Sequence, residues 1–303
     1  MIDDTKETAW RVYKNGNYLV YFNTYDGTKI RANKLQTMEP EYPESIDMCI
    51  SHRCDGGCPF CYDGATPDGA AADLMNLPFM DTWIPNTEIA INLNDMSHPQ
   101  LIDFLKMAHD KGFIVSGTIR QHHFMQHREK LAELTKSHLL YGIGISLTSP
   151  SEEFIAEVKK FPNAVLHVIH GITTVEDMRR LYDQDLKVLV LGYKTKGRGK
   201  DFKKENDKMV SQIQEEFYDA LPEMPDHFAV LSFDNHALNQ LDVKRLMSEE
   251  DWNEFYMGDD GQYSFYVDAV NKTFSRSSLS DHSYPMKADI KDMFEVVRNE
   301  SKS

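Results

Sequence analysis

The sequence is poor in cysteine and in positive charge, and each shortage excludes a class of protein. Its four cysteines all lie between positions 49 and 61, whereas a disulfide-braced scaffold would spread them through the chain. Lysine and arginine number 33 against 48 aspartates and glutamates, which gives a net charge of −15. A chain this acidic is repelled by phosphate backbones at long range, so we expect no non-specific nucleic-acid binding.

Long apolar runs are missing as well. No uncharged apolar stretch reaches the roughly 20 residues that span a bilayer, and residues 1–7 are polar and acidic, unlike the basic and then apolar start of a signal peptide. We therefore expect a cytoplasmic protein with no membrane partner. The hydrophobic content of 41% is ordinary for a globular protein, and the length allows one large α/β domain or two small ones.

Turn signals near the N-terminus predict a small β element over residues 1–44. An Asn-Gly pair stands at 15–16 and an Asp-Gly pair at 26–27, and the strand-forming residues 18–22 lie between them. Such pairs favour tight turns between antiparallel strands. We expect a hairpin or small meander that packs on the main domain.

The main domain is predicted to be α/β and to span residues 45–235. Short apolar runs alternate there with helical patterns such as the one that begins at Thr174, where Asp177 completes a capping box. Several runs, 187–191 among them, are continuous, as in strands that are buried on both faces. The predicted strands are 46–50, 88–93, 113–119, 140–147, 164–169, 187–193 and 228–233.

Alternating strands and helices predict right-handed crossovers and a parallel sheet. Either a partial or complete (β/α) barrel or an open doubly wound sheet fits this order. Residues 236–303 depart from the alternation, with a helix near 236–246, a strand pair around 262–274 and a polar tail. We expect this C-terminal α+β extension to cap the main domain.

Three cysteines form the pattern C-x3-C-x2-C directly after the predicted strand 46–50: Cys54, Cys58 and Cys61. Thiolates are the usual ligands of iron–sulfur clusters, and four irons usually take four of them. Three ligands leave one iron open for a small molecule, as in a catalytic metal site. The alternative is a structural zinc site that adds Cys49, which would need a sharp chain reversal.

This cysteine pattern, with Phe60 before its last cysteine, resembles the radical S-adenosylmethionine (SAM) superfamily over roughly residues 45–235. The resemblance implies a partial (β/α)6-type barrel and a [4Fe–4S] cluster on Cys54, Cys58 and Cys61. SAM would chelate the open iron, and an external one-electron reductant of flavodoxin or ferredoxin type would supply the electron. SAM would then yield methionine and a 5′-deoxyadenosyl radical that abstracts hydrogen from substrate.

The resemblance also implies further contacts to SAM. The family's Gly-Gly-Glu-like motif falls on Asn94 and Asp95, where the glycines are absent, and a turn or helix cap is the other interpretation of both residues. His122, His123 and His127 are expected to face solvent or to play supporting roles. The residues with an implied SAM contact are Phe60, Asn94, Asp95, Thr118, Arg120, Ser146, His167, Gly192 and Tyr193.

The substrate is the least constrained part of the hypothesis. Lys194, Lys196 and Arg198 open a basic stretch that is either a solvated loop or a site for a substrate phosphate or carboxylate. No cysteine follows Cys61, which excludes a second cysteine-ligated cluster. We predict a peptide or protein substrate. The alternatives are a nucleotide or small anionic metabolite, and a non-enzymatic, zinc-stabilised binding module.

Overall fold

The N-terminal β element is a three-stranded antiparallel sheet in the computed structural model, which describes residues 9–34 and 37–300. Its strands are β1 (Trp10–Asn15), β2 (Tyr18–Asn23) and β3 (Lys29–Ala32), paired in chain order. The Asn-Gly pair stands at the end of β1 and the Asp-Gly pair lies between β2 and β3, so the predicted meander is present. The remaining residues assigned to this element, 1–8 and 35–36, lie outside the described residues.

A ten-stranded sheet forms the rest of the framework, in the order β10-β9-β8-β7-β6-β5-β4-β11-β12-β13. From β10 to β11 every neighbouring pair is parallel, and β12 and β13 are antiparallel additions at one edge. The parallel strands are β4 (Ser45–Cys49), β5 (Glu88–Asn94), β6 (Ile114–Arg120), β7 (Gly142–Ser146), β8 (Ala164–Ile169), β9 (Lys187–Leu191), β10 (Val230–Phe233) and β11 (Ser264–Asp268), followed by β12 (Thr273–Ser275) and β13 (Tyr284–Pro285).

The predicted parallel α/β sheet is therefore confirmed, and all seven strands predicted between residues 45 and 235 are present. A closed barrel is not formed by the described residues, because the edge strands β10 and β13 do not pair with each other. An open sheet leaves one side of the molecule to be covered by other segments.

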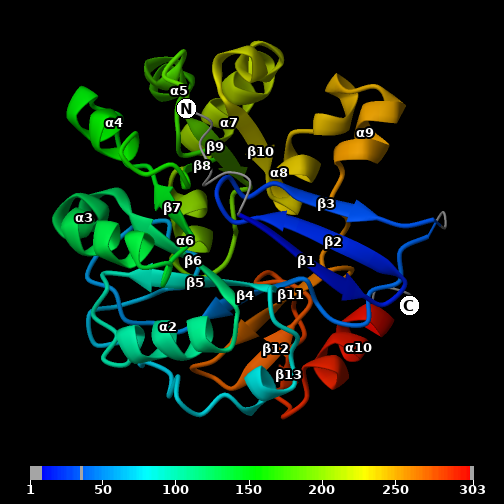
Figure 1. Ribbon diagram of the computed structural model, residues 1–303. Coiled ribbons are helices and arrows are strands. Elements are labelled where there is room, and N and C mark those ends of the chain that lie inside the picture. The colour runs from blue at the N-terminus through cyan, green and yellow to red at the C-terminus, as the bar shows by residue number, and fades with distance from the viewer. Residues whose placement is uncertain (1–8, 35–36, 301–303) are drawn as a thin grey trace, which may run out of the picture.

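Helices follow one another around the outside of the curved sheet, as α2, α3, α4, α5 and α7 show (Figure 1). The capping box predicted at Thr174 is present, with Asp177 as its partner. The helices are α2 (Leu101–Asp110), α3 (Gln121–Lys136), α4 (Glu152–Val158), α5 (Val175–Leu181), α6 (Arg198–Glu205), α7 (Asp207–Ala220), α8 (Asn235–Gln240), α9 (Glu249–Phe255) and α10 (Ile290–Glu300), with short 3₁₀ turns at Pro78–Asp81, Leu221–His227 and Val243–Leu246.

The two faces of the large sheet differ in burial. Along β5, β6, β8 and β9, fully buried residues alternate with half-buried ones. The buried face carries the apolar core under the helices, and we call the half-buried face the inner face. The expectation that 187–191 is buried on both faces is wrong, because Leu189 and Leu191 stand half-exposed on the inner face.

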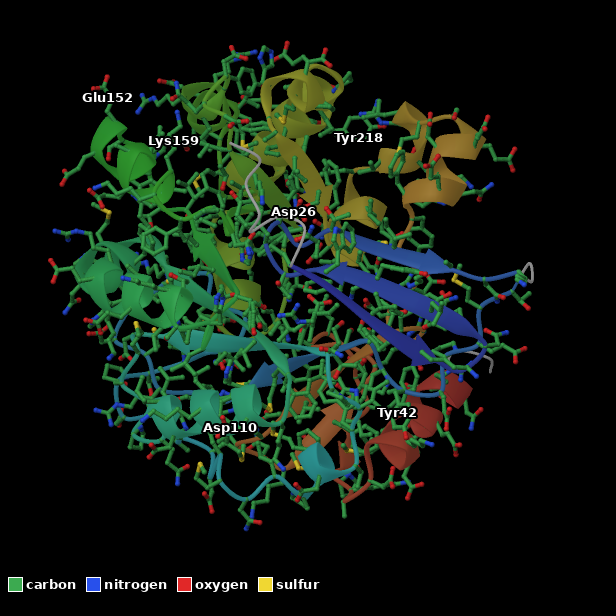
Figure 2. All side chains as sticks on the ribbon, in the orientation of Figure 1. Asp26, Tyr42, Asp110, Glu152, Lys159 and Tyr218 are labelled. Carbon is green, nitrogen blue, oxygen red and sulfur yellow. The ribbon has the colours of Figure 1, made fainter. Side chains whose placement is uncertain are left out.

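The N-terminal sheet packs on the amino ends of the parallel strands. The guanidinium of Arg31 donates to both carboxylate oxygens of Glu44, just before β4, at 2.8 and 3.0 Å. Lys187 Nζ, at the start of β9, donates to the carbonyl of Asp26 at 3.3 Å, and Asp26 lies near the centre of the view in Figure 2. The carboxyl ends of the strands, where the cysteines lie, are left free of this sheet.

The C-terminal region joins the main sheet. The predicted strand pair is confirmed as β11 and β12, and β11 pairs in parallel with β4. The expectation of a polar tail is wrong, because α10 buries Ile290, Met293, Phe294 and Val297 in the core. Their spacing of three, one and three residues is that of a helix face. The division at residues 235 and 236 stays a prediction.

Among the helices that the structure describes, none has the length and apolar character needed to cross a membrane.

Candidate functional site

The three cysteines lie on a loop that leaves the carboxyl end of β4, residues 54–65, which we call the cysteine loop. Its two ends are joined, since the amide of Cys54 donates to the carbonyl of Thr66 at 2.9 Å and the amide of Thr66 donates to that of His52 at 3.0 Å. Within the loop, the Cys61 amide donates to the Cys58 carbonyl at 3.3 Å. All three thiols are half-buried, so they are ordered by the protein and still accessible.

The spacing of the thiols bears on what they can hold. Zinc at 2.3 Å from each sulfur needs thiolates about 3.8 Å apart, the edge of its tetrahedron. The sulfurs of Cys54, Cys58 and Cys61 do not all lie within 4.8 Å of one another. Wider spacing suits ligands that bind different corners of a cluster, so the donor set fits a cysteine-ligated iron–sulfur cluster better than one ion.

Cys49 does not join the other three cysteines. Its thiol is buried beside Asn92 Nδ2, at 3.6 Å, and donates to the carbonyl of Ser51 at 3.7 Å. Its sulfur lies 3.9 Å from Nδ1 of His52, which is flanked by the carboxylates of Asp63 and Asp268 at 3.1 and 3.4 Å. This polar network gives Cys49 partners of its own.

Strand β5 supports the start of the cysteine loop through two asparagines. Asn92 Nδ2 donates to the Ser51 carbonyl at 2.7 Å, and its Oδ1 accepts from the Ile50 amide at 2.7 Å. Asn94 Nδ2 donates to the carbonyls of Ser51 and Arg53 at 2.9 and 2.7 Å. The amide of Asn94 is thus occupied with backbone, and its predicted SAM contact stays a prediction.

Asp95 stabilises the turn after β5 and also binds the cysteine loop through its side chain. Its Oδ1 accepts from the amide and hydroxyl of Ser97 at 3.0 and 2.5 Å, and its Oδ2 accepts from the Asp55 amide at 3.3 Å. Partial burial raises the pKa of Asp95, but these hydrogen bonds outweigh burial and the pKa is lowered overall. The side chain is therefore a carboxylate at neutral pH, which can accept hydrogen bonds and cannot donate them.

Strand β6 and helix α3 contact the loop from a second direction. The guanidinium of Arg120 donates to the carbonyl of Gly56, so this predicted site residue does reach the cysteine loop. His123 is only 3% exposed, and its Nε2 lies 2.6 Å from Oδ1 of Asp55. His123 therefore supports the loop, as one of the two roles expected for it.

The charge around Cys58 is positive. Burial raises the pKa of the Cys58 thiol, while the nearby guanidiniums of Arg120 and Arg198 act to lower it. Burial likewise raises the pKa of Cys54. Two fixed cations beside these sulfurs would offset the negative charge of thiolates bound to a metal cluster.

Thr118, Ser146 and His167 lie together on the inner face, beside the cysteine loop. Ser146 is in register with Arg120 on one side and with His167 on the other. A Cβ on Gly144 would lie 2.3 Å from Cε1 of His167 and 3.0 Å from Oγ1 of Thr118, so the glycine makes room for the imidazole. Burial, aided by Lys194, lowers the pKa of His167 to about 4, and the ring is neutral at pH 7.

The inner face also brings carboxylates close to one lysine. Asp47, on β4, is exposed to the inner side of the sheet and has no hydrogen-bond partner among the described residues. Its side chain has open surface, but the protein that surrounds this face desolvates the carboxylate and raises its pKa to about 6, with Lys194 opposing the shift and Asp260 and Asp234 adding to it. Burial lowers the pKa of Lys194, while the same three carboxylates act to raise it.

The predicted substrate cations are engaged with the protein. Lys194 Nζ donates to Oγ of Ser278 at 3.0 Å and lies 4.1 Å from the ring centroid of Tyr62. Lys196 Nζ donates to the carbonyl of Ser278 at 2.9 Å. Arg198 donates to two carbonyls of the cysteine loop. Their predicted role in substrate binding stays a prediction, but each cation already has a structural partner.

Gly192 and Tyr193 have structural roles at the end of β9. A Cβ on Gly192 would lie 2.6 Å from Cδ2 of His236 and 2.8 Å from the amide nitrogen of Ala237, so the glycine admits helix α8. The phenol of Tyr193 is buried and donates to the Gly199 carbonyl at 2.7 Å. The amides of Gly192 and Tyr193 donate to Asp234 Oδ1 and Gln240 Oε1, each at 2.9 Å. The SAM contacts predicted for Gly192 and Tyr193 stay predictions.

Three residues of the site were not singled out from the sequence. Asn92 occupies an inner-face position of β5, two residues before the predicted Asn94, and that strand alternation could have pointed to it. Asp47 is a lone charge within the apolar run of β4, which is a comparable signal. Asp268 could not have been found, because it reaches His52 from β11, more than 200 residues along the chain.

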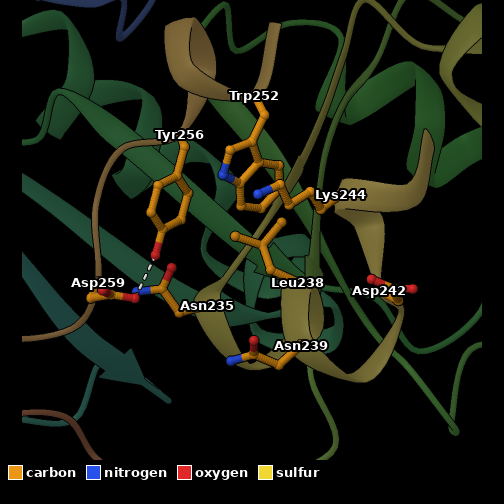
Figure 3. Close-up of a pocket in the computed structure, with 8 residues that line it drawn as sticks. All are labelled: Asn235, Leu238, Asn239, Asp242, Lys244, Trp252, Tyr256 and Asp259. Carbon is orange, nitrogen blue, oxygen red and sulfur yellow. Dashed lines mark hydrogen bonds between the residues drawn. The ribbon is translucent and has the colours of Figure 1, made fainter. Parts of the chain in front are cut away.

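One pocket lies elsewhere, between α8 and α9, with a volume of about 210 Å³ (Figure 3). The rings of Trp252 and Tyr256 stack at 4.8 Å along one wall, and the phenol of Tyr256 donates to Asp259 at 2.6 Å. None of its lining residues is a predicted site residue. They are Asn235, Leu238, Asn239, Asp242, Lys244, Trp252, Tyr256 and Asp259.

Fold and site together define an α/β protein with a solvent-accessible triad of thiols at the carboxyl ends of its parallel strands. No family model matches the sequence, and no curated protein matches it. Among solved structures, Streptococcus suis SuiB bound to S-adenosylmethionine is similar, with a TM-score of 0.60, 11% sequence identity, and coverage of 97% of this chain and 89% of SuiB. At that identity the likeness shows the fold.

Proposed function

We propose that this chain is a radical SAM enzyme in which Cys54, Cys58 and Cys61 hold a [4Fe–4S] cluster. The observation that carries the proposal is the cysteine loop itself. It holds three half-buried thiols at the carboxyl ends of parallel strands, and their sulfurs do not all lie within 4.8 Å of one another. Ligand sites of open α/β sheets lie at that edge. The similarity in fold to SuiB, which was solved bound to SAM, supports the same assignment.

When bound, the cluster would supply the electron that splits SAM into methionine and a 5′-deoxyadenosyl radical. The chain's own residues would hold and orient the reactants. Arg120 and Arg198 offset negative charge beside Cys58. Asp95 offers a carboxylate for the SAM ammonium group, in the place of the family's glutamate, and remains tied to Asp55 while doing so.

The nucleoside part of SAM would lie along the inner face. His167 is neutral and half-buried there, Ser146 is its neighbour in register, and Gly144 makes room for the imidazole over the sheet. A neutral imidazole can donate from one nitrogen and accept at the other, as an adenosine's hydroxyls and ring nitrogens require. Shielding by the surrounding sheet would also keep water from a reactive carbon radical.

For the substrate we infer a peptide or protein side chain in preference to an anionic metabolite. The basic stretch that would attract an anion is engaged elsewhere, by Ser278 and by the cysteine loop. The inner face instead presents the unpaired carboxylate of Asp47, with Asp234 and Asp260 near Lys194. This balance of charge disfavours phosphate or carboxylate substrates.

The test is anaerobic reconstitution with iron and sulfide, followed by reduction in the presence of SAM. The expected result is a brown protein with about four irons per chain that releases 5′-deoxyadenosine. Cys58→Ala should lose both properties, whereas Cys49→Ala should retain the iron, because Cys49 has separate partners. A colourless protein with stoichiometric zinc that depends on Cys49 would establish the binding-module alternative instead.

A further inference from the structure

The geometry points to Arg198 as a positioning residue that holds the cysteine loop in the shape needed to bind its cluster. Arg198 is the first residue of helix α6. It donates hydrogen bonds to two residues of the loop that precede it by 140 and 133 positions in the chain. The role in cluster binding rests on the function proposed above, whereas the contacts of Arg198 with the loop do not depend on that function.

The contacts of Arg198 span the part of the loop that carries two of the three thiols. Its Nε donates to the carbonyl of Cys58 at 3.0 Å, and its Nη1 donates to the carbonyl of Ala65 at 2.9 Å. The guanidinium therefore bridges the middle of the cysteine loop and its end. The carbonyl of Cys58 also accepts from the amide of Cys61, so the bridge holds the turn between these two cysteines.

The residues on either side of Arg198 pack on the same segment. Gly197 adopts φ +53, and a Cβ there would lie 2.3 Å from the carbonyl oxygen of Tyr62 and 2.9 Å from that of Cys61. The ring of Phe202 meets the ring of Phe60 edge to face, with centroids 5.9 Å apart. The start of α6 thus lies in direct contact with the loop from Cys58 to Ala65.

Arg198 differs from Lys200, the next cation along helix α6. The neighbouring Lys200 is exposed and has no side-chain partner among the described residues. A planar guanidinium can donate to two carbonyls in different directions at once, which a lysine ammonium on a flexible stem does less well. The role assigned to Arg198 therefore depends on its hydrogen bonds and not on its charge alone.

The experiment measures hydrogen exchange in the metal-free protein, which reports on the loop without requiring a cluster. In Arg198→Ala the amide of Cys61 should exchange at least about tenfold faster than in the wild type, a ratio that corresponds to about 1.4 kcal/mol. Arg198→Lys should give an intermediate rate. Lys200→Ala, which removes a charge from the same helix turn, should leave the rate unchanged.

A second pair of variants tests the inference even if Arg198→Ala does not fold. Gly197→Ala inserts a methyl group against the loop, whereas Gly64→Ala has a similar positive φ of 67° and nothing within 4 Å of its Cβ. Gly197 combines φ 53 with ψ −140, a conformation that is nearly confined to glycine, so Gly197→Ala adds backbone strain to the collision with the loop. Gly197→Ala should therefore speed exchange at Cys61, and Gly64→Ala should not. Equal rates in this pair, or an Arg198→Ala rate equal to that of Lys200→Ala, would overturn the inference.

The same variants separate the inference from the proposed function. After reconstitution, Arg198→Ala should lose iron to a chelator about tenfold faster than Lys200→Ala, and SAM should perturb the electron paramagnetic resonance signal of its reduced cluster less. A wild-type protein that takes up no iron would refute the proposed function and leave the exchange result intact. Iron held equally well by all variants would refute only the role of Arg198.

Discussion

Substituting Gly144 by alanine is a direct test of the predicted SAM pocket. The new Cβ would lie 2.3 Å from Cε1 and 2.6 Å from Nε2 of His167, well inside van der Waals contact. The imidazole must therefore rotate or the strands must separate. Overpacking of this kind costs about 1–3 kcal/mol, and in a chain of this length 1 kcal/mol shifts the unfolding temperature by roughly 2 °C.

The assay is a double-mutant cycle with His167→Ala, read by thermal unfolding and by SAM binding to the reconstituted protein. Because the alanine at 167 removes the atoms that collide, Gly144→Ala should be nearly neutral for stability in that background. The coupling energy between the two sites should then be about 1–2 kcal/mol. In the wild-type background, Gly144→Ala should also weaken SAM binding, since the displaced ring would occupy the space above the sheet.

Two results would contradict the reasoning. If Gly144→Ala costs the same free energy of unfolding with and without His167, the imidazole does not lie where the structure has it. If the substitution destabilises the protein through His167 but leaves SAM binding unchanged, the pocket is elsewhere on the inner face. Gly142→Ala is the matched control on the same strand, because the nearest atom to its Cβ would be Cβ of Ser116 at 3.3 Å.

The remaining predictions concern the docking of the N-terminal sheet and the titration of the inner face. Glu44→Ala should lower the free energy of unfolding by about 3–5 kcal/mol in urea titrations, because it removes a carboxylate that is only 1% exposed and that forms an ion pair with Arg31. The exposed Glu41→Ala should change the free energy of unfolding by less than about 1 kcal/mol, and equal effects would contradict the buried pairing. His167 has a folded-state pKa of about 4, below that of the unfolded chain, so the unfolded state binds more protons between pH 6.5 and 4 and stability falls as the pH falls through that window. His167→Gln should remove up to about 1.4 kcal/mol per pH unit from the dependence of the unfolding free energy on pH. Asp47, whose pKa is raised to about 6, contributes with the opposite sign, so Asp47→Asn should make the unfolding free energy fall more steeply on acidification. The same pH dependence in the wild type and both variants would refute both titrations.

Much of the fold could be predicted because its signals are local. The seven strands between residues 45 and 235 were visible as short apolar runs, and the N-terminal meander followed from its Asn-Gly and Asp-Gly turns. The helix α10 was missed, although Ile290, Met293, Phe294 and Val297 have helical spacing, because the polar residues between them dominate the composition. Sheet closure could not be predicted, since it depends on whether β10 meets β13.

The cysteine loop was predicted as a unit, but its supports were not. Arg120 was expected near the site and does contact Gly56. Arg198 was expected to meet substrate, and the structure shows its guanidinium bound to the carbonyls of Cys58 and Ala65. Hydrogen bonds from a side chain to distant backbone carbonyls leave no trace in composition or spacing, because any residue supplies the same carbonyl.

By itself the sequence determined the order of the strands and helices, the N-terminal turns, and the grouping of three thiols on one loop. These features depend on residues that are close along the chain, where spacing and conformational preference act directly. Only the tertiary structure decided that the sheet stays open, that its inner face carries Asp47 and His167, and that α6 packs on the cysteine loop. Those outcomes depend on contacts between segments that can be more than 200 residues apart, as β4 and β11 are, and their energies arise only when the chain has folded.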